Sequence, residues 1–60
     1  MLSKLAETIW LKIAGAPAEW FEENTSLLAR ATLAIYRKDG KENARMFINL
    51  CRMAIVVNVA

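Results

Sequence analysis

A turn signal centred on Gly40 separates two helical segments of this chain, and it constrains the fold more than any other feature. Glycine can take the positive-φ conformation that ends a helix, and Arg37 and Lys38 put positive charge beside the last carbonyls of the preceding helix. Asp39 and Glu42 form a capping-box-like pair suited to starting the next helix. Apolar residues on both sides recur every three or four positions, so the sequence predicts a helical hairpin.

A second turn signal, at Gly15 and Pro17, separates a short amphipathic helix from this hairpin. Gly15 is a suitable helix terminator, and Pro17 suits the first position of a helix because its missing N–H costs nothing there. Neither an internal repeat nor a linker divides the chain. The prediction is one all-α domain over residues 1–60 with three helices, at about 2–14, 17–38 and 41–58.

The helix predicted over 17–38 contains one weak point, the polar run that begins at Asn24. Short polar side chains compete for backbone hydrogen bonds and prefer helix ends. We expect the helix to continue, because the apolar spacing stays in phase, with Asn24 facing the core and needing a hydrogen-bond partner. Leu33 falls in the polar stripe. The apolar face is expected to contain Trp20, Phe21, Leu27, Leu28, Ala31, Ala34 and Ile35.

The helix predicted over 41–58 is apolar over a wider arc than one neighbouring helix requires. Hydrophobic residues make up 57% of the chain, against roughly 45–50% in ordinary globular domains. A domain of 60 residues buries only about 60% of the surface that its unfolded chain exposes. We therefore predict a homodimeric helical bundle in which the second and third helices form a shared core. The β-branched run at 55–59 leaves a frayed or extended C-terminal end as an alternative.

The predicted oligomer or partner interface consists of large apolar side chains. Trp10 and Trp20 are expected to meet across the Gly15–Pro17 bend, and packing in a core or an interface is favoured over a ligand-binding box. Methionines suit an adaptable contact surface. The predicted interface residues are Trp10, Trp20, Phe21, Leu33, Met46, Phe47, Leu50, Met53, Ile55 and Val57.

Few residues in the chain suit catalysis or cofactor binding. Histidine is absent, and the one cysteine, Cys51, has apolar neighbours that would raise its pKa and make it inert. Glu19, Glu22 and Glu23 are explained as solvent-exposed charges near a helix N-terminus. No nucleophile–base pair, metal-ligand set or phosphate-binding loop is recognisable. We expect no enzymatic activity, no cofactor and no bound metal.

The longest uncharged run, residues 53–60, is far shorter than the roughly 20 apolar residues of a membrane-spanning helix. Glu7 and Lys12 interrupt the apolar core that a secretory signal would need. A lone cysteine without such a signal fits a reducing compartment. We therefore expect a cytoplasmic protein.

The net charge of +2 is unevenly distributed, with −2 in residues 1–29 and +4 in residues 30–60. Helix ends and a solvated face are the simpler explanation of the basic half, although it would also suit an anionic partner. The predicted function is a non-enzymatic protein–protein interaction or regulatory module, an inhibitor or adaptor. One alternative is a nucleic-acid-binding regulator, and a third is a membrane-surface-active amphipathic protein. The residues that would contact nucleic acid are Arg37, Lys38, Lys41, Arg45 and Arg52.

Overall fold

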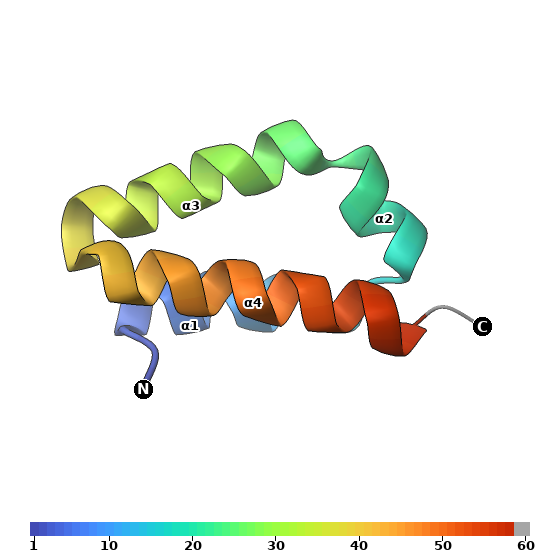
Figure 1. The fold of residues 1–60 in the computed structure, drawn as a ribbon, viewed down its shortest axis with the longest axis horizontal. Coiled ribbons are helices and arrows are strands. Elements are labelled where there is room, and N and C mark those ends of the chain that lie inside the picture. Colours follow the sequence, from blue (N-terminus) through green and yellow to red (C-terminus); the bar gives the residue numbers. More distant parts are fainter. Residues whose placement is uncertain (59–60) are drawn as a thin grey trace.

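The computed structural model describes residues 1–58, which form four α-helices (Figure 1). The all-α prediction is confirmed, but the helix predicted over 17–38 is divided in two. Helix α4 contacts each of the other three helices and is the central element of the fold. The helices are α1 (Lys4–Ile13), α2 (Ala18–Glu23), α3 (Thr25–Asp39) and α4 (Lys41–Asn58).

Helix α1 begins two residues later than predicted, because Ser3 acts as its N-cap. The Ser3 Oγ accepts a hydrogen bond from the Ala6 N–H at 3.3 Å. The Ser3 backbone N–H donates to Oδ1 of Asn43, in the first turn of α4, at 2.6 Å. These two bonds fix the start of α1 against α4. Pro17 likewise lies just before α2 as its N-cap instead of inside it.

A break at Asn24 separates α2 from α3, so the expectation of a continuous helix is wrong. Asn24 has φ −116° and ψ 33°, outside the helical region. Its Nδ2 donates to the Trp20 carbonyl at 2.8 Å, and its backbone N–H donates to the same oxygen at 3.0 Å. The short amide side chain thus competes for a carbonyl that a continuing helix would use. Helix α3 restarts at once, with the Leu28 N–H bonded to the Asn24 carbonyl at 3.0 Å.

The break changes which residues of α3 are buried. Leu28, Ala31 and Ile35 face the core, whereas Leu27 and Ala34, both expected on the apolar face, are exposed. An uninterrupted helix would keep Leu27 in phase with Trp20 and Phe21, but α3 starts anew in a different direction (Figure 1). The requirement that Asn24 find a hydrogen-bond partner is met by the Trp20 carbonyl.

The turn between α3 and α4 is made by Gly40 alone. Its φ of 92° and ψ of 178° lie in a region that essentially only glycine occupies, and its N–H donates to the Tyr36 carbonyl at 3.0 Å. The predicted helix end at Gly40 is confirmed. The predicted cap by Asp39 is wrong, because Asp39 remains the last residue of α3 and its buried Oδ2 has no hydrogen-bond partner within residues 1–58. The Gly40 carbonyl accepts the Ala44 N–H at 3.3 Å.

The core lies where α4 meets the other helices, and its largest fully buried side chains are Phe21, Ile35 and Phe47. The Phe21 ring lies 6.3 Å from that of Trp10, in a tilted arrangement, and 5.3 Å from that of Trp20, edge to face. Phe21 is therefore the ring that Trp10 meets across the bend, in place of the expected Trp20. Small residues complete the core and allow close approach of the helices: Ala6, Ala44, Cys51 and Ala54.

Helix α4 remains helical to Asn58, so the extended alternative is not adopted up to that residue, and Val59 lies outside the described residues. Its wide apolar arc is covered in part by α1 and α2 as well as α3, so the chain itself supplies more than one neighbouring helix. No helix in residues 1–58 combines the length and the apolar character needed to span a lipid bilayer.

Candidate functional site

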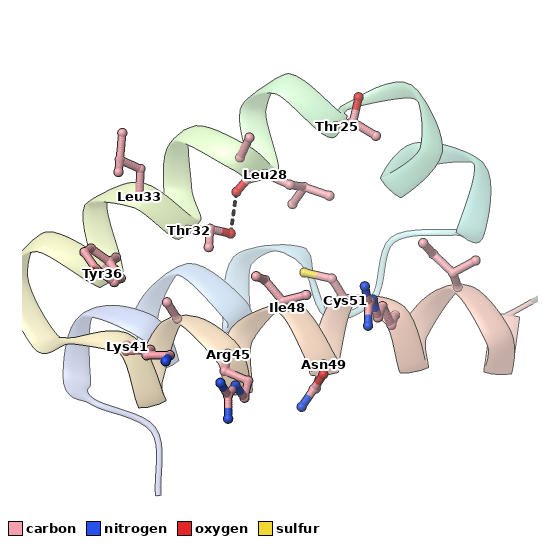
Figure 2. Close-up of a pocket in the computed structure, with 14 residues that line it drawn as sticks. Thr25, Leu28, Thr32, Leu33, Tyr36, Lys41, Arg45, Ile48, Asn49 and Cys51 are labelled. Atoms are coloured by element: carbon pink, nitrogen blue, oxygen red, sulfur yellow. Dashed lines mark hydrogen bonds between the residues drawn. The ribbon is translucent and has the colours of Figure 1, made fainter.

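An open groove of about 950 Å³ runs between α3 and α4 (Figure 2). Helix α1 packs against both α3 and α4 and lies behind α4 in Figure 1, so it covers one face of the hairpin and leaves the groove on the other face. Between Lys41 and Ile55 the lining of α4 advances 14 residues, which corresponds to a length of about 21 Å. The groove is therefore long enough for three or four turns of a facing helix.

Both walls of the groove follow helical spacing, with residues three and four apart on each helix. Three of the apolar side chains in the lining are well exposed: Leu33 at 46%, Tyr36 at 54% and Ile48 at 39%. Helix α3 contributes Thr25, Leu28, Ala29, Thr32, Leu33 and Tyr36. Helix α4 contributes Lys41, Ala44, Arg45, Ile48, Asn49, Cys51, Arg52 and Ile55.

The middle of the groove is lined mainly by apolar side chains, and the hydroxyl group of its polar residue Thr32 is already hydrogen-bonded. The Thr32 Oγ1 donates to the Leu28 carbonyl of its own helix at 2.7 Å, so its hydroxyl donor is already satisfied. Figure 2 shows Leu28, Thr32, Ile48 and Cys51 between the two helices. A surface of this kind favours an occupant that buries apolar side chains without having to satisfy polar groups of the wall.

The charged residues that line the groove are all basic. Lys41, Arg45 and Arg52 lie on α4, and neither Asp nor Glu belongs to the lining. Arg37 and Lys38 lie outside the groove, in the last turn of α3. All five residues expected to contact nucleic acid are exposed, and within residues 1–58 none of them forms an ion pair. Their positive charge is therefore not neutralised locally.

Three of the six acidic residues lie at the other end of the hairpin, on α2, whereas Asp39 and Glu42 lie at its turn. Glu19, Glu22 and Glu23 are exposed on α2, and Thr25, which lines the groove, follows Glu23 by two residues. Figure 1 shows α2 at one end of the molecule and the α3–α4 turn at the opposite end. These three glutamates and the basic residues of the turn therefore lie towards opposite ends of the 34 Å long axis, although Arg52 lines the groove on the half of α4 nearer α2.

The predicted interface residues do not form one surface. Phe21 and Phe47 are fully buried within the chain, and Trp20 packs on Phe21, so these three rings belong to the core. Leu33 and Ile55 line the groove. Met46 is half-buried in α4. A smaller hollow of about 230 Å³ between α1 and α4 is lined by Trp10, Ala14, Leu50, Met53, Ala54 and Val57.

Sequence reasoning missed Ile48 as apolar surface of the groove, and it considered Tyr36 only as a residue at the helix end whose ring or hydroxyl could contact a partner. The one signal for this apolar surface was Leu33, an apolar residue in an otherwise polar stripe of α3. The rest of the wall is indistinguishable in the sequence from the core-facing residues, because both recur at the same helical spacing. Which apolar residues stay uncovered depends on where α1 packs.

Residues with reactive side chains are not gathered into a site. Burial raises the pKa of the Cys51 thiol, as expected, and this favours the unreactive protonated form. Within residues 1–58 no group of three or more acidic or cysteine side chains has a metal-binding arrangement. Comparison with known protein families, with curated proteins and with solved structures finds no match to this chain.

Proposed function

We propose that this protein is a small non-enzymatic protein–protein interaction module, an inhibitor or adaptor, that assembles as a helical homo-oligomer and acts by presenting a helical surface. The observation that carries the proposal is the α3–α4 groove, an apolar surface about 21 Å long on the face of the hairpin that α1 leaves uncovered. Contiguous exposed apolar surface of this kind marks interaction sites in soluble proteins.

The apolar side chains of the groove give the proposal its energetic basis. Removing apolar surface from water contributes roughly 25 cal/mol per Å², so covering Leu33, Tyr36 and Ile48 would stabilise a complex. Tyr36 is the side chain best suited to an interface, because it combines a large ring with a polar tip and has few rotatable bonds. Phe21 and Phe47 are fully buried in the core, whereas these groove residues are exposed and free for binding.

Light scattering after size exclusion tests the proposal. At micromolar concentration the wild type should have a molar mass above that of one chain. The Ile48→Glu variant should have the molar mass of a single chain, because burying a carboxylate in the apolar groove is unfavourable. Val56→Glu is the matched control: Val56 is 75% exposed on the same helix and belongs to neither hollow. A monomeric wild type would contradict the assembly, and equal effects of the two variants would contradict the groove as its site.

The inhibitor or adaptor role is tested by using the protein as bait to capture binding partners from a lysate of the native host. A specific partner should be recovered with the wild type and with Val56→Glu, and lost with Ile48→Glu if the partner depends on the assembled form. Recovery of the same proteins with all three chains would argue against a role for the groove.

A nucleic-acid-binding regulator is the second candidate, favoured by five exposed basic residues that make no ion pairs within residues 1–58. Binding to generic RNA or duplex DNA should weaken steeply with salt if phosphates are contacted. Replacing Arg37 by Ala should reduce the slope of log K against log[salt] by about 1, whereas Lys12→Ala, an exposed lysine on α1, should leave it unchanged. No binding even at low salt would remove this candidate.

A further inference from the structure

The charged residues that line the α3–α4 groove lie on one wall only. Lys41, Arg45 and Arg52 all belong to α4, whereas the lining contributed by α3 contains no charged residue. At roughly 100° per residue, the three basic side chains fall within about 40° of one another around the axis of α4. They therefore form a single basic row, which advances about 16 Å along α4 from the turn towards the half nearer α2.

An apolar row lies beside the basic row, on the side of α4 that faces α3. Figure 2 shows Ile48 directed towards α3 and Arg45 directed away from it. The apolar row consists of Ala44, Ile48, Cys51 and Ile55. Across the groove, the surface thus changes from uncharged on α3, through apolar in the middle, to basic along the outer edge of α4.

The acidic residues nearest to the basic row do not neutralise it. Glu42 is exposed but is not part of the lining, and Asp39 is half-buried in the last turn of α3. Neither forms an ion pair within residues 1–58. An occupant that complements the whole groove therefore supplies negative charge along the α4 edge and apolar side chains over the rest.

We propose that the α3–α4 groove binds an acidic amphipathic helix of a partner protein. The apolar stripe of that helix covers Leu33 and Ile48, and its carboxylates face Lys41, Arg45 and Arg52. This inference rests on the proposed function, because it takes the groove as the interaction surface, and it names the chemistry of the partner. A partner helix and a second copy of this chain would compete for the same groove.

The shape of the groove favours a helix over other anionic ligands. A length of about 21 Å matches three or four helical turns, and an amphipathic helix places apolar anchors three and four residues apart, as the two walls do. A nucleic acid has no apolar side chains to cover Leu33 and Ile55, and its phosphates would find basic partners on one wall only. An anionic lipid surface is flat and would not enter the space between the two helices.

Fluorescence anisotropy with designed peptides tests the chemistry of the partner. The probe is a labelled peptide of about 14 residues with leucines at i, i+4, i+7 and i+11 and with glutamates along one flank of that stripe. One matched peptide has lysines in place of the glutamates, and another has the same residues in an order without an apolar stripe. The acidic amphipathic peptide should bind the wild type at least about tenfold more tightly than either.

Charge reversal on α4 tests the site. Arg45→Glu combined with Arg52→Glu should raise the dissociation constant of the acidic peptide about tenfold or more and should strengthen binding of the lysine peptide. Lys4→Glu combined with Lys12→Glu is the matched control. It makes the same change in net charge at two exposed positions of α1, outside the groove, and should leave both affinities unchanged. Circular dichroism of each variant first establishes that its helices are retained.

The outcomes separate this inference from the proposed assembly. Equal binding of the acidic and lysine peptides, or unchanged binding after charge reversal on α4, overturns the inference. So does binding of RNA or of phosphatidylserine vesicles that is lost in Ile48→Glu while the acidic peptide does not bind. A wild type that is monomeric in light scattering and binds the acidic peptide contradicts the assembly and leaves the inference intact. A wild type that assembles but does not bind the peptide contradicts the inference alone.

Discussion

The backbone N–H of Ser3 donates a hydrogen bond of 2.6 Å to Oδ1 of Asn43, which lies 40 positions later in the chain. Ser3 also caps α1 through its side chain, so a single residue both starts that helix and attaches it to the first turn of α4. Because α1 covers only one face of the hairpin, this attachment helps to decide which face remains uncovered.

Replacing Asn43 by Ala removes the acceptor and leaves the half-buried Ser3 N–H without its partner. We expect the free energy of unfolding to fall by about 1–3 kcal/mol, measured by urea denaturation followed by circular dichroism. Asn43→Asp retains an oxygen at the same place and should keep most of the stability. The second bond of Asn43, from Nδ2 to the Asp39 carbonyl at 3.4 Å, is too long to contribute much. Equal losses in the two variants would contradict the assigned role of Oδ1.

Gly40 is the position at which a side chain is least tolerated for conformational reasons. A Cβ at Gly40 would meet no atom within 4 Å, but its φ of 92° is strained for any other residue. Gly40→Ala should therefore lower the free energy of unfolding by about 1–3 kcal/mol in thermal or urea denaturation.

Gly15 provides the matched control, since a Cβ there also meets no atom within 4 Å and its φ is not positive. Gly15→Ala should be neutral or stabilising by up to about 1 kcal/mol, because alanine restricts the unfolded chain. A similar loss at both glycines would show that the turn at Gly40 does not depend on its positive φ.

Phe21 contributes more to the core than its position in the shortest helix suggests. It is fully buried and its ring contacts both Trp10 and Trp20. Phe21→Ala should therefore lower the free energy of unfolding by about 3–5 kcal/mol. In so small a domain this loss should remove most of the helical circular dichroism signal. Leu27→Ala, at a leucine that is 51% exposed, should change stability by no more than about 0.5 kcal/mol. Retention of the wild-type spectrum in Phe21→Ala would contradict this packing.

The raised pKa of Cys51 predicts slow reaction with thiol reagents and a particular pH dependence. Since the unfolded state releases the thiol proton more readily than the folded state, stability should be fully present below the ordinary thiol pKa and should decline as the pH rises through it. Cys51→Ala is the control, and its free energy of unfolding should lack the part of the decline with pH that the thiol causes. Labelling at pH 7 should accelerate strongly in denaturant, and rapid labelling of the folded chain would contradict burial of the thiol.

Local features of the sequence predicted the helices well where one residue type determines the backbone. Gly40 ends α3, and the break near Pro17 separates α1 from the rest, because glycine and proline act through their own backbone geometry. Asn24 was a less specific signal for a helix end. Its side-chain amide can face solvent within a continuous helix, or it can donate to a carbonyl of the preceding turn, as it does to that of Trp20. The energies of these alternatives differ too little for the sequence alone to choose.

The groove was the least predictable feature. Leu28 and Ile48 have the spacing of core residues. Both would have been fully buried if α1 or α2 had packed against the face of the hairpin that carries the groove. The contact between Ser3 and Asn43 and the tilted ring contact of Trp10 with Phe21 hold α1 on the other side. These are contacts between residues distant in the sequence, which periodicity does not specify.

The sequence by itself determined that the chain is helical, where its hairpin turns, and that its first half is net acidic and its second half net basic, because periodicity, glycine conformation and charge order are local properties. The tertiary structure decided that Phe21 and Phe47 fill the core, that Asn24 divides a helix, and that Tyr36 and Ile48 remain exposed beside the basic residues of α4. The physical reason is that burial depends on how three short helices share the surface of α4, and an apolar stripe does not specify which neighbour covers it.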